Sequence, residues 1–454
     1  MPANRGRACA RAVRHAVLLA GIALACGPAT ASAGVVPPDF YGVNSGSAVI
    51  TNAALRGPAL QAMAAGGLRY VRVDASWGGI EPAAPVAGVH RYVWGVYDTW
   101  VADLARHGLR WYPMVGYSAP WASSVPGDAF TPPAGDADFA AFARALAARY
   151  GPGGQFWAEH LELPSLPVTV YGIWNEPSNE HFWHGPEATP ARYMSLYVAA
   201  RAAIRSYDVS ARVATAGLLD SGTVDGDAFL RAMLDGAPAA RGQIDAVGWH
   251  PYVGDVDQVL ESVAKARATL TRYGLGSVPI EISEVGMHSG YAPAQRAQWL
   301  HDLAMELPNA GLNVTRLLPY VWSGDPLWQI TDPDGSPGLI GSAYFAGIAD
   351  AAAFTSQPLA PATTAVTTAA ASKPKARTAK ACKVARSRKG RAARRGRKAK
   401  RCTSQAARTS RAKARAKAAR ARAKATRARA ARAKAARARG VRARAARARR
   451  THRS

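Results

Sequence analysis

The sequence predicts an α/β fold, a (β/α)8 TIM barrel followed by a disordered basic C-terminal tail. Eight short apolar segments, each followed by a loop rich in Trp, Pro or Gly and then by an amphipathic segment, extend over about 320 residues, a length that suits such a barrel with insertions. The near-continuous apolar run Val168–Trp174 is typical of a parallel strand buried on both faces. A doubly wound open sheet is the alternative, but no Gly-rich phosphate loop follows the first strand.

The predicted strands are spaced so that a helix fits after each of them. They are Phe40–Asn44, Leu68–Asp74, Leu109–Val115, Val168–Trp174, Ala211–Ala216, Ile244–His250, Val278–Ser283 and Val314–Trp322. Apolar spacing defines four of the helices, namely Asp138–Tyr150, Arg192–Tyr207, Val256–Tyr273 and Ala292–Leu307. In the first helix, Phe139, Phe142 and Leu146 share one face, and Gly151 follows as a C-cap.

Residues 1–33 predict a secretion signal peptide. Arginines come first, the apolar stretch Ala16–Ala25 follows, and Ala31-Ser32-Ala33 offers a small-residue cleavage site. The apolar stretch is too short for a stable membrane anchor. Cys26 raises lipoprotein processing as an alternative, but Ala23 stands where such signals usually have Leu. We therefore expect a secreted protein.

Charge divides the rest of the chain. Residues 373–454 hold 35 Lys and Arg and no acidic residue, whereas residues 34–372 hold all 30 acidic residues and 19 basic ones. We expect a catalytic domain over 34–355, a Pro/Ala/Thr-rich linker over 356–372 and a disordered Ala/Arg/Lys-rich tail over 373–454. The tail is predicted to bind an anionic wall polymer or a membrane surface, which would hold the secreted protein at the cell surface. Specific nucleic-acid binding is not expected, because no aromatic residue interrupts the tail.

The cysteines give no sign of a metal site. Cys9 and Cys26 lie in the signal segment, Cys382 and Cys402 lie in the tail, and whether the latter two form a disulfide stays open. Neither metal-binding Cys/His spacing nor a cofactor motif is present, so no metal and no cofactor is expected.

Two acidic segments stand at predicted strand ends. Tyr171–Pro177 contains Glu176 at the end of the fourth strand, and Val278–Gly286 contains Glu284 at the end of the seventh. Active sites of such barrels lie where the carboxyl ends of the strands meet. Cleavage of a glycosidic bond needs one protonated carboxyl group and, in retaining enzymes, a second carboxylate about 5–5.5 Å away. Strands four and seven face one another across an eight-stranded ring, so the pair fits this chemistry.

The same segments resemble clan-A glycoside hydrolases, with family 39 and its relatives the most similar. The resemblance rests on Trp174–Trp183 and Ile282–Gly286, on Val71–Trp77 with Ile80–Pro82, and on Tyr117–Ser123, and it covers roughly Phe40 to Ala353. It implies that Glu176 is the acid/base and Glu284 the nucleophile. The β-rich modules that many family-39 xylosidases carry are not visible, which puts transfer of their xylosidase specificity in doubt.

The resemblance also implies roles for other residues. Asn175 would bind the sugar 2-hydroxyl, Arg72 would keep Glu284 ionised, and His250 and Tyr252 would line the site. Trp322 would form the apolar floor on which a pyranose stacks. Further residues expected to bind substrate are Trp121, Trp77, His181 and Trp183.

Several alternatives stay open from the sequence. Glu281 competes with Glu284 as nucleophile, although strand alternation turns it to the other face. Arg72 could neutralise Asp74 on the same strand instead of serving the site. Glu180 is expected to be a solvated charge and Glu81 a structural anchor of its loop.

The sequence therefore predicts a secreted retaining glycoside hydrolase that cleaves O-glycosidic bonds, β-linked ones above all, in oligo- or polysaccharides. A non-catalytic polysaccharide-binding cell-surface protein, and a transglycosylase that uses the same residues, are the alternatives.

Overall fold

The computed structural model describes residues 36–37 and 39–356, and within them eight parallel strands form one sheet in the order of the sequence. The strands are β1 (Gly42–Asn44), β2 (Tyr70–Ser76), β3 (Arg110–Gly116), β4 (Val170–Ile173), β5 (Arg212–Ser221), β6 (Ala246–Tyr252), β7 (Ile280–Ile282) and β8 (Val314–Leu317). The predicted signal peptide, the tail and the linker after residue 356 lie outside the described residues.

The sheet closes on itself through the first and last strands. Parallel bridges join Tyr41 to Leu317 and Asn44 to Tyr320. The Asn44 backbone N–H donates to the Pro319 carbonyl (3.0 Å), and its carbonyl accepts from the Trp322 N–H (2.8 Å). The prediction of a (β/α)8 barrel is therefore confirmed for the described part of the chain.

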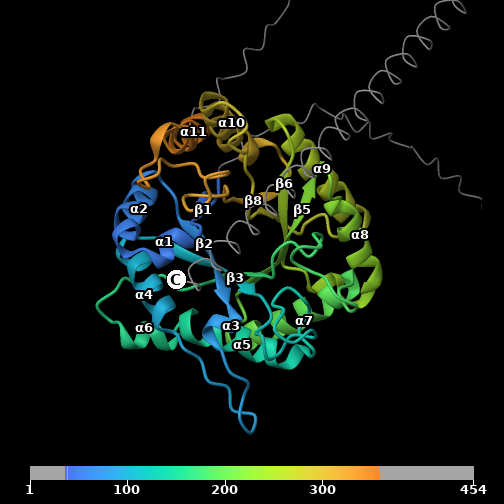
Figure 1. The fold of residues 1–454 in the computed structure, drawn as a ribbon. Coiled ribbons are helices and arrows are strands. Elements are labelled where there is room, and N and C mark those ends of the chain that lie inside the picture. Colours follow the sequence, from blue (N-terminus) through green and yellow to red (C-terminus); the bar gives the residue numbers. More distant parts are fainter. Residues whose placement is uncertain (1–35, 38, 357–454) are drawn as a thin grey trace, which may run out of the picture. The chain divides into compact units, whose positions relative to one another are not determined.

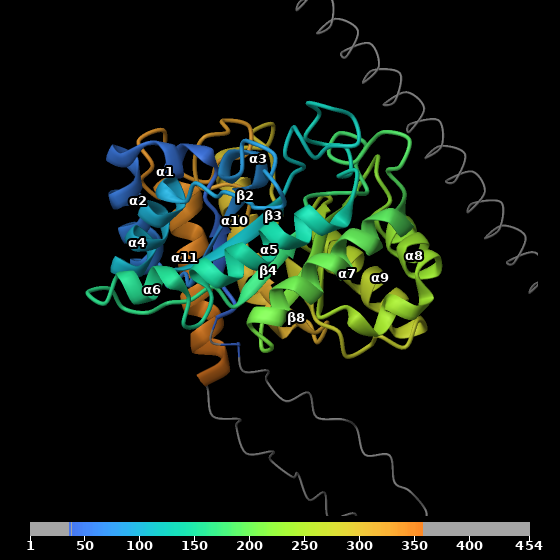
Figure 2. The same ribbon diagram turned by 90° about the horizontal axis from the view of Figure 1, so that it is seen from below.

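Helices surround the strands on the outside of the ring, as Figure 1 shows. They are α1 (Ser47–Thr51), α2 (Ala53–Ala65), α3 (Trp77–Ile80), α4 (Gly95–Arg106), α5 (Asp136–Tyr150), α6 (Gln155–Glu159), α7 (Pro190–Tyr207), α8 (Gly226–Gly236), α9 (Val256–Arg272), α10 (Pro293–Glu306) and α11 (Gly338–Ser356). In the view turned by 90°, α1 and α3 are seen to lie at the same end of the strands (Figure 2). Because α1 follows β1 and α3 follows β2, this end is the one where side chains after each strand gather.

The observed strands shift by one or two residues from the predicted ones at most ends, and two strands differ by more than that. Strand β5 runs on to Ser221 because it stays paired with β6 up to Tyr252, after a register shift between Ala214 and Gly217. Strand β8 ends at Leu317, whereas Val314–Trp322 was predicted as one strand. The difference at β8 changes which side chains reach the site.

The inside of the barrel holds aromatic rings and the buried ion pair between Glu281 and Arg316. Tyr70, Tyr112 and Val170, from neighbouring strands, pack with Leu318 just after β8. Because β4 and β8 lie on opposite sides of the ring, Val170 and Leu318 can belong to one cluster only across the interior of the barrel. Among the described residues, no helix is long and apolar enough to cross a membrane.

Candidate active site

The two predicted catalytic carboxylates lie together at the mouth of the barrel. Glu176 follows β4 and Glu284 follows β7, and both side chains are buried. One oxygen of each, together with a ring nitrogen of His250, lie within 4.8 Å of one another. Two carboxyl groups at this separation suit a sugar held between them.

Glu284 is held by donors from three strands. Its Oε1 accepts hydrogen bonds from Arg72 Nη1 (2.5 Å) and Asn44 Nδ2 (3.3 Å), and its Oε2 accepts one from the Tyr252 hydroxyl (2.9 Å). A guanidinium beside a carboxylate favours the charged form of both groups. The surroundings of Glu284 are therefore those of an ionised carboxylate with a fixed orientation.

Among the described residues, Arg72 makes its hydrogen bonds to Glu284 and Asn175 and none to Asp74, its neighbour on the strand. Its second nitrogen, Nη2, donates to Asn175 Oδ1 at 2.8 Å. Burial alone would lower the pKa of Arg72, but the negative charges of Glu284 and Asp74 raise it above its usual value. The guanidinium thus links β2 to the ends of β4 and β7 as a permanent cation.

Glu176 has different surroundings. Its Oε1 lies 2.9 Å from His250 Nδ1, and its Oε2 accepts a hydrogen bond from Asn179 Nδ2 at 2.9 Å. Burial raises the pKa of Glu176 above its usual value, and the hydrogen bond from Asn179 and the charge of Arg72 offset part of this rise. A carboxyl group with a raised pKa can keep a proton nearer to neutral pH, as a general acid must.

His250 is a neutral bridge between these groups. Burial lowers its pKa to about 3, and its Nε2 lies 2.9 Å from the Ser283 hydroxyl. The hydroxyl can donate or accept, so it can match either tautomer of the ring. Gly217 on β5 makes room for the imidazole, since a Cβ there would lie 1.8 Å from Nε2.

The backbone that carries Glu176 is strained and is tied down nearby. Trp174 and Glu176 both have positive φ values, 70° and 44°, which cost free energy for residues with a side chain. Two residues further on, the Ser178 hydroxyl accepts from the Leu219 N–H (2.9 Å) and donates to the Leu219 carbonyl (3.4 Å). The loop after β4 is thereby fixed to the end of β5.

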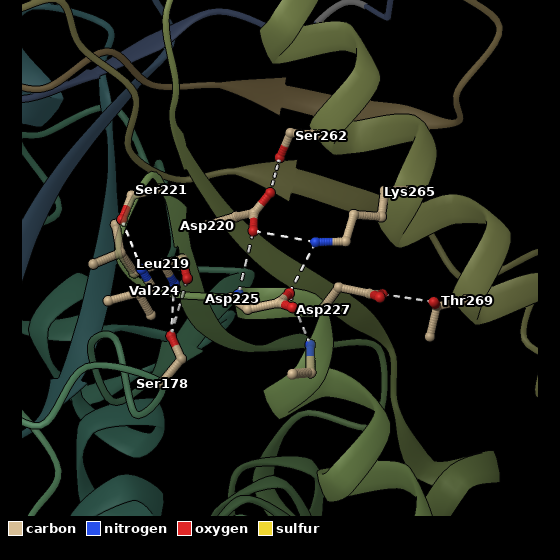
Figure 3. Close-up of polar contacts among 12 residues, drawn as sticks. Ser178, Leu219, Asp220, Ser221, Val224, Asp225, Asp227, Ser262, Lys265 and Thr269 are labelled. Carbon is tan, nitrogen blue, oxygen red and sulfur yellow. Dashed lines mark hydrogen bonds and ion pairs between the residues drawn. The ribbon is translucent and has the colours of Figure 1, made fainter. Parts of the chain in front are cut away.

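A buried polar network in turn fixes the end of β5, as Figure 3 shows. Asp220 accepts a hydrogen bond from Ser262 on α9 (2.6 Å) and lies 3.6 Å from the Lys265 ammonium. Asp227 on α8 accepts from Thr269 of α9 at 2.6 Å. Lys265 pairs with Asp220, and Arg231 pairs with Asp227. Because each acid has a cationic partner, we interpret the network as structural support for the loop that carries Glu176.

The two predicted catalytic carboxylates open into a cleft of about 800 Å³, large enough for a small molecule or several sugar units. Its wall combines polar side chains with aromatic rings. The lining residues are Asn44, Gly46, Ser47, Ile50, Arg72, Val73, Asp74, Ser76, Tyr97, Tyr117, Asn175, Glu176, Phe182, Leu219, Ser221, Tyr252, Glu284, Tyr320, Asp325 and Trp328.

Trp322 and Trp77 do not line this cleft. Both are fully buried: the ring of Trp322 packs near Phe345 of α11 at 6.1 Å, and Trp77 stacks on Phe142 of α5 at 5.9 Å. Trp322, predicted as a stacking floor for a sugar, is therefore not among the residues that line the cleft. The reason is that β8 ends early and Trp322 turns toward the outer helices.

The other predicted aromatic contacts also belong mainly to packing. Trp183 is buried against Trp174 (5.1 Å between ring centroids), and the half-buried Trp121 packs against Trp77 (5.2 Å). His181 is exposed beside Phe182. The residue of this segment that reaches the cleft is Phe182.

The sequence interpretation missed four aromatic residues of the cleft besides Phe182. Tyr117 follows β3, Tyr320 follows β8, and Trp328 lies against Tyr252 with ring centroids 5.0 Å apart. Trp328 belongs to the loop between β8 and α11, where large aromatics in a loop could have been the signal. Tyr97, which also lines the cleft, lies on α4 and looked like an ordinary core residue.

The other acidic residues considered from the sequence, Glu281, Glu81 and Glu180, lie outside the cleft. Glu281 points into the barrel interior, where it is fully buried, forms an ion pair with Arg316 and accepts from the Tyr112 hydroxyl (2.9 Å). Glu81 accepts from Trp77 Nε1 (2.8 Å) and is fully buried, as expected of a structural anchor. Glu180 is exposed.

Glu176, His250 and Glu284 are the one group of described residues whose carboxylate and imidazole atoms lie close enough to share a metal ion. Arg72 already brings a positive charge to Glu284. The carboxylates of Glu176 and Glu284 thus accept hydrogen bonds from side chains of the protein itself.

Comparison with solved structures agrees with this architecture. A glucosidase from Croceicoccus marinus matches with a TM-score of 0.52 and 17% identity, over 70% of this chain and 69% of that one. A monomeric β-xylosidase from Caulobacter crescentus CB15 matches with a TM-score of 0.50 and 19% identity, over 69% of both chains. A family 39 enzyme from Xanthomonas axonopodis pv. citri matches with a TM-score of 0.50 and 20% identity, over 69% of this chain and 67% of that one.

The chain has the fold of family 39 glycoside hydrolases. Identities this low carry the fold and not the substrate. In sequence, the chain matches no protein-family model and no curated protein. The similarity to clan A expected from the motifs is confirmed at the level of the fold.

Proposed function

We propose that this protein is a secreted retaining glycoside hydrolase that cleaves β-linked O-glycosidic bonds of oligo- or polysaccharides. The observation that carries the proposal is the pair Glu176 and Glu284, whose oxygens come within 4.8 Å across the barrel mouth. Inverting enzymes need roughly 6.5–9.5 Å between carboxyl groups to admit a water molecule. The shorter separation supports direct attack by one carboxylate.

In the first step, Glu284 attacks the anomeric carbon while the bond from that carbon to the glycosidic oxygen breaks. Glu176 gives its proton to the departing oxygen, so a neutral alcohol leaves and a covalent glycosyl ester remains. Arg72 and Tyr252 stabilise the carboxylate of Glu284 before attack. Asn175 uses its oxygen toward Arg72, which leaves its amide nitrogen for the sugar 2-hydroxyl.

In the second step, Glu176 is a carboxylate and takes a proton from water, whose oxygen attacks the anomeric carbon and releases Glu284. The neutral His250 fits this exchange, because it adds no charge as Glu176 loses and regains its proton. The Asn179 amide stabilises the ionised form that acts as base.

The names of similar structures agree with this class of reaction. The proteins that match with TM-scores of 0.50 or more are called a glucosidase, a β-xylosidase and a family 39 enzyme. Those names suggest the β-configuration as the first one to try. The sugar and the linkage have to come from experiment.

The test is turnover of a panel of aryl β-glycosides, with the configuration of the first product followed by proton NMR. We expect the β-anomer first, and at least about 10²-fold lower activity in Glu176→Gln and Glu284→Gln, both folded. The exposed Glu180→Gln is the matched control and should keep full activity. Full activity of either catalytic variant, or the α-anomer as first product, contradicts the proposal.

The same assay separates the alternatives. A transglycosylase would transfer the sugar to an added alcohol or oligosaccharide faster than to water. A non-catalytic binding protein would retain polysaccharide with no turnover, and Glu284→Gln would not change its binding.

We further propose that residues 1–33 direct export and that residues 373–454 hold the enzyme to an anionic surface. The 35 cationic residues of that tail support this proposal. Deleting residues 373–454 should abolish sedimentation with vesicles of anionic lipid or with an anionic wall polymer, and leave turnover of a soluble aryl glycoside unchanged. Undiminished sedimentation of the truncated chain contradicts it.

A further inference from the structure

The cleft is lined by several carboxyl groups, and its one cationic group already has hydrogen-bond partners in the protein. Four carboxylates line it, those of Asp74, Glu176, Glu284 and Asp325. The one cationic residue in the lining is Arg72, and its two terminal nitrogens donate to Glu284 and Asn175. Among the described lining residues, no cation is left for an acidic group on a ligand.

One of the four carboxylates has no donor. Glu284 accepts three hydrogen bonds, Glu176 has two partners, and Asp325 accepts from a backbone N–H at 3.0 Å. The carboxylate of Asp74 has no hydrogen bond and no ion pair with any described residue. Its backbone carbonyl alone is used, by the Tyr97 hydroxyl (3.0 Å).

Asp74 faces the place where a sugar would sit. It stands two residues after Arg72 on β2, so both side chains point to the same side of the strand, with Asp74 nearer the mouth. Its side chain is open to the cleft. The cleft walls nevertheless keep much of the bulk water away. This desolvation raises the pKa of Asp74 to about 6; the charge of Arg72 offsets part of the rise, and the charge of Glu284 adds to it. A carboxylate in such a place gains most from a ligand that donates hydrogen bonds.

We propose that Asp74 binds donor groups, hydroxyl or ammonium, of the sugar held beside Glu284, and that the cleft takes neutral or amino sugars and rejects uronic acids. The inference rests on the proposed hydrolase function and adds its substrate class. A hydroxyl or ammonium group satisfies the free carboxylate of Asp74, whereas a uronate would meet the carboxylates of Asp74, Glu284 and Asp325 and no free cation.

The experiment compares 4-nitrophenyl β-glucoside, β-glucosaminide and β-glucuronide, which share one ring and differ in one substituent. The wild-type protein should turn over the glucuronide with a kcat/KM at least about 10²-fold below the better of the other two. Which of the two is better tells whether the hydroxyl or the ammonium is the natural donor.

Asp74→Ala tests the residue itself. It should lower kcat/KM for the better substrate about 10- to 100-fold, the loss of one or two hydrogen bonds to a charged acceptor. Its kcat/KM for the glucuronide should fall less or rise, so the discrimination narrows. Asp257→Asn, an exposed change of the same charge on α9, is the control and should alter neither value.

A glucuronide preference in the wild type overturns the inference while leaving the hydrolase proposal intact. An equal loss on all three substrates in Asp74→Ala, the signature of a merely structural role, overturns it too. If none of the three is hydrolysed, calorimetric titration of Glu176→Gln with the corresponding methyl β-glycosides decides. The inference is contradicted if the glucuronide binds as tightly as the other two glycosides, or if none of the three binds. The absence of turnover, by contrast, counts only against the proposed hydrolase function.

Discussion

Two glutamates three residues apart, Glu281 and Glu284, each form an ion pair with an arginine, yet only one of them belongs to the cleft. Glu281 in β7 pairs with Arg316 and accepts from a tyrosine hydroxyl inside the barrel, with no exposed surface. Glu284, just past the strand, pairs with Arg72 and accepts from another tyrosine hydroxyl. The partners of the two carboxylates are thus nearly the same in kind.

The difference lies in access and in the second acid. Glu284 lines the cleft, and Glu176 stands opposite it, whereas the interior around Glu281 is closed by packed aromatic rings. An acid–arginine pair is therefore not by itself a sign of catalysis. Chemistry is favoured by its place at the carboxyl end of the strands, where it faces a second carboxyl group whose pKa is raised by burial.

The sharpest way to break this comparison is to neutralise each acid in turn. Glu284→Gln should remove activity by at least about 10²-fold. It should leave the unfolding midpoint near that of the wild type, because Arg72 keeps Asn175 as an acceptor and Asp74 as a nearby negative charge. Glu281→Gln should keep turnover per folded molecule but lower the free energy of unfolding by about 3–5 kcal/mol, because Arg316 is left buried and unpaired. Aryl-glycoside kinetics and urea unfolding measure both quantities, and a stable but inactive Glu281→Gln would contradict the account.

Replacing both partners of a pair sharpens the contrast. The double variant Glu281→Leu with Arg316→Met should recover most of the stability lost in the single variant, since an apolar pair of similar size needs no charge partner. The equivalent double change at Glu284 and Arg72 should recover no activity. Urea unfolding of the single and double variants gives the answer, and a double variant no more stable than the single one would argue against a simple interior ion pair.

Displacing the His250 ring tests whether its position beside Glu176 is needed for activity. Gly217→Ala would bring a methyl group onto the imidazole, so the ring must leave the position in which its Nδ1 lies 2.9 Å from Glu176 Oε1. We expect kcat to fall by about 10²-fold, the scale of a misplaced catalytic group. Gly242→Ala, which meets no atom within 4 Å, is the control. Wild-type kcat in Gly217→Ala would exclude a positioning role for His250.

The smallest expected effect is a shift of the pH profile. The Asn179 amide donates to Glu176 and so favours its ionised form. Asn179→Ala should raise the pKa of Glu176 further, which moves the alkaline limb of kcat/KM to higher pH, because the acid keeps its proton longer. The acid limb should stay in place. An alkaline limb that moves to lower pH, or not at all, would contradict this role.

The positions of the two catalytic carboxylates could be predicted from the sequence. Parallel strands in a ring end at the same side, so acids at the ends of the fourth and seventh strands had to approach one another. This inference needed only the order of the strands and their approximate ends. Strand alternation did not explain why Glu281 stays out of the site, because Glu281 points into the barrel interior and Glu284 lies past the end of β7 at Ile282.

The walls of the cleft could not be predicted in the same way. The apolar run at β8 does not reveal that the strand stops at Leu317, and this early end puts Tyr320 at the cleft and Trp322 in the core. Tyr97 reaches the site from α4, where its spacing is that of a packing residue. Such side chains depend on loop paths and tertiary packing, which the local pattern does not encode.

The most direct test of the central claim is to trap the covalent intermediate. A 2-deoxy-2-fluoro glycoside with an activated leaving group, made from the sugar that the aryl-glycoside panel favours, slows the second step so that the glycosyl enzyme accumulates. Mass spectrometry of peptides should find the label on Glu284, with Glu281→Gln labelled as the wild type is and Glu284→Gln unlabelled. A label on any other residue, or an unlabelled protein that still turns over its substrate, would contradict the account.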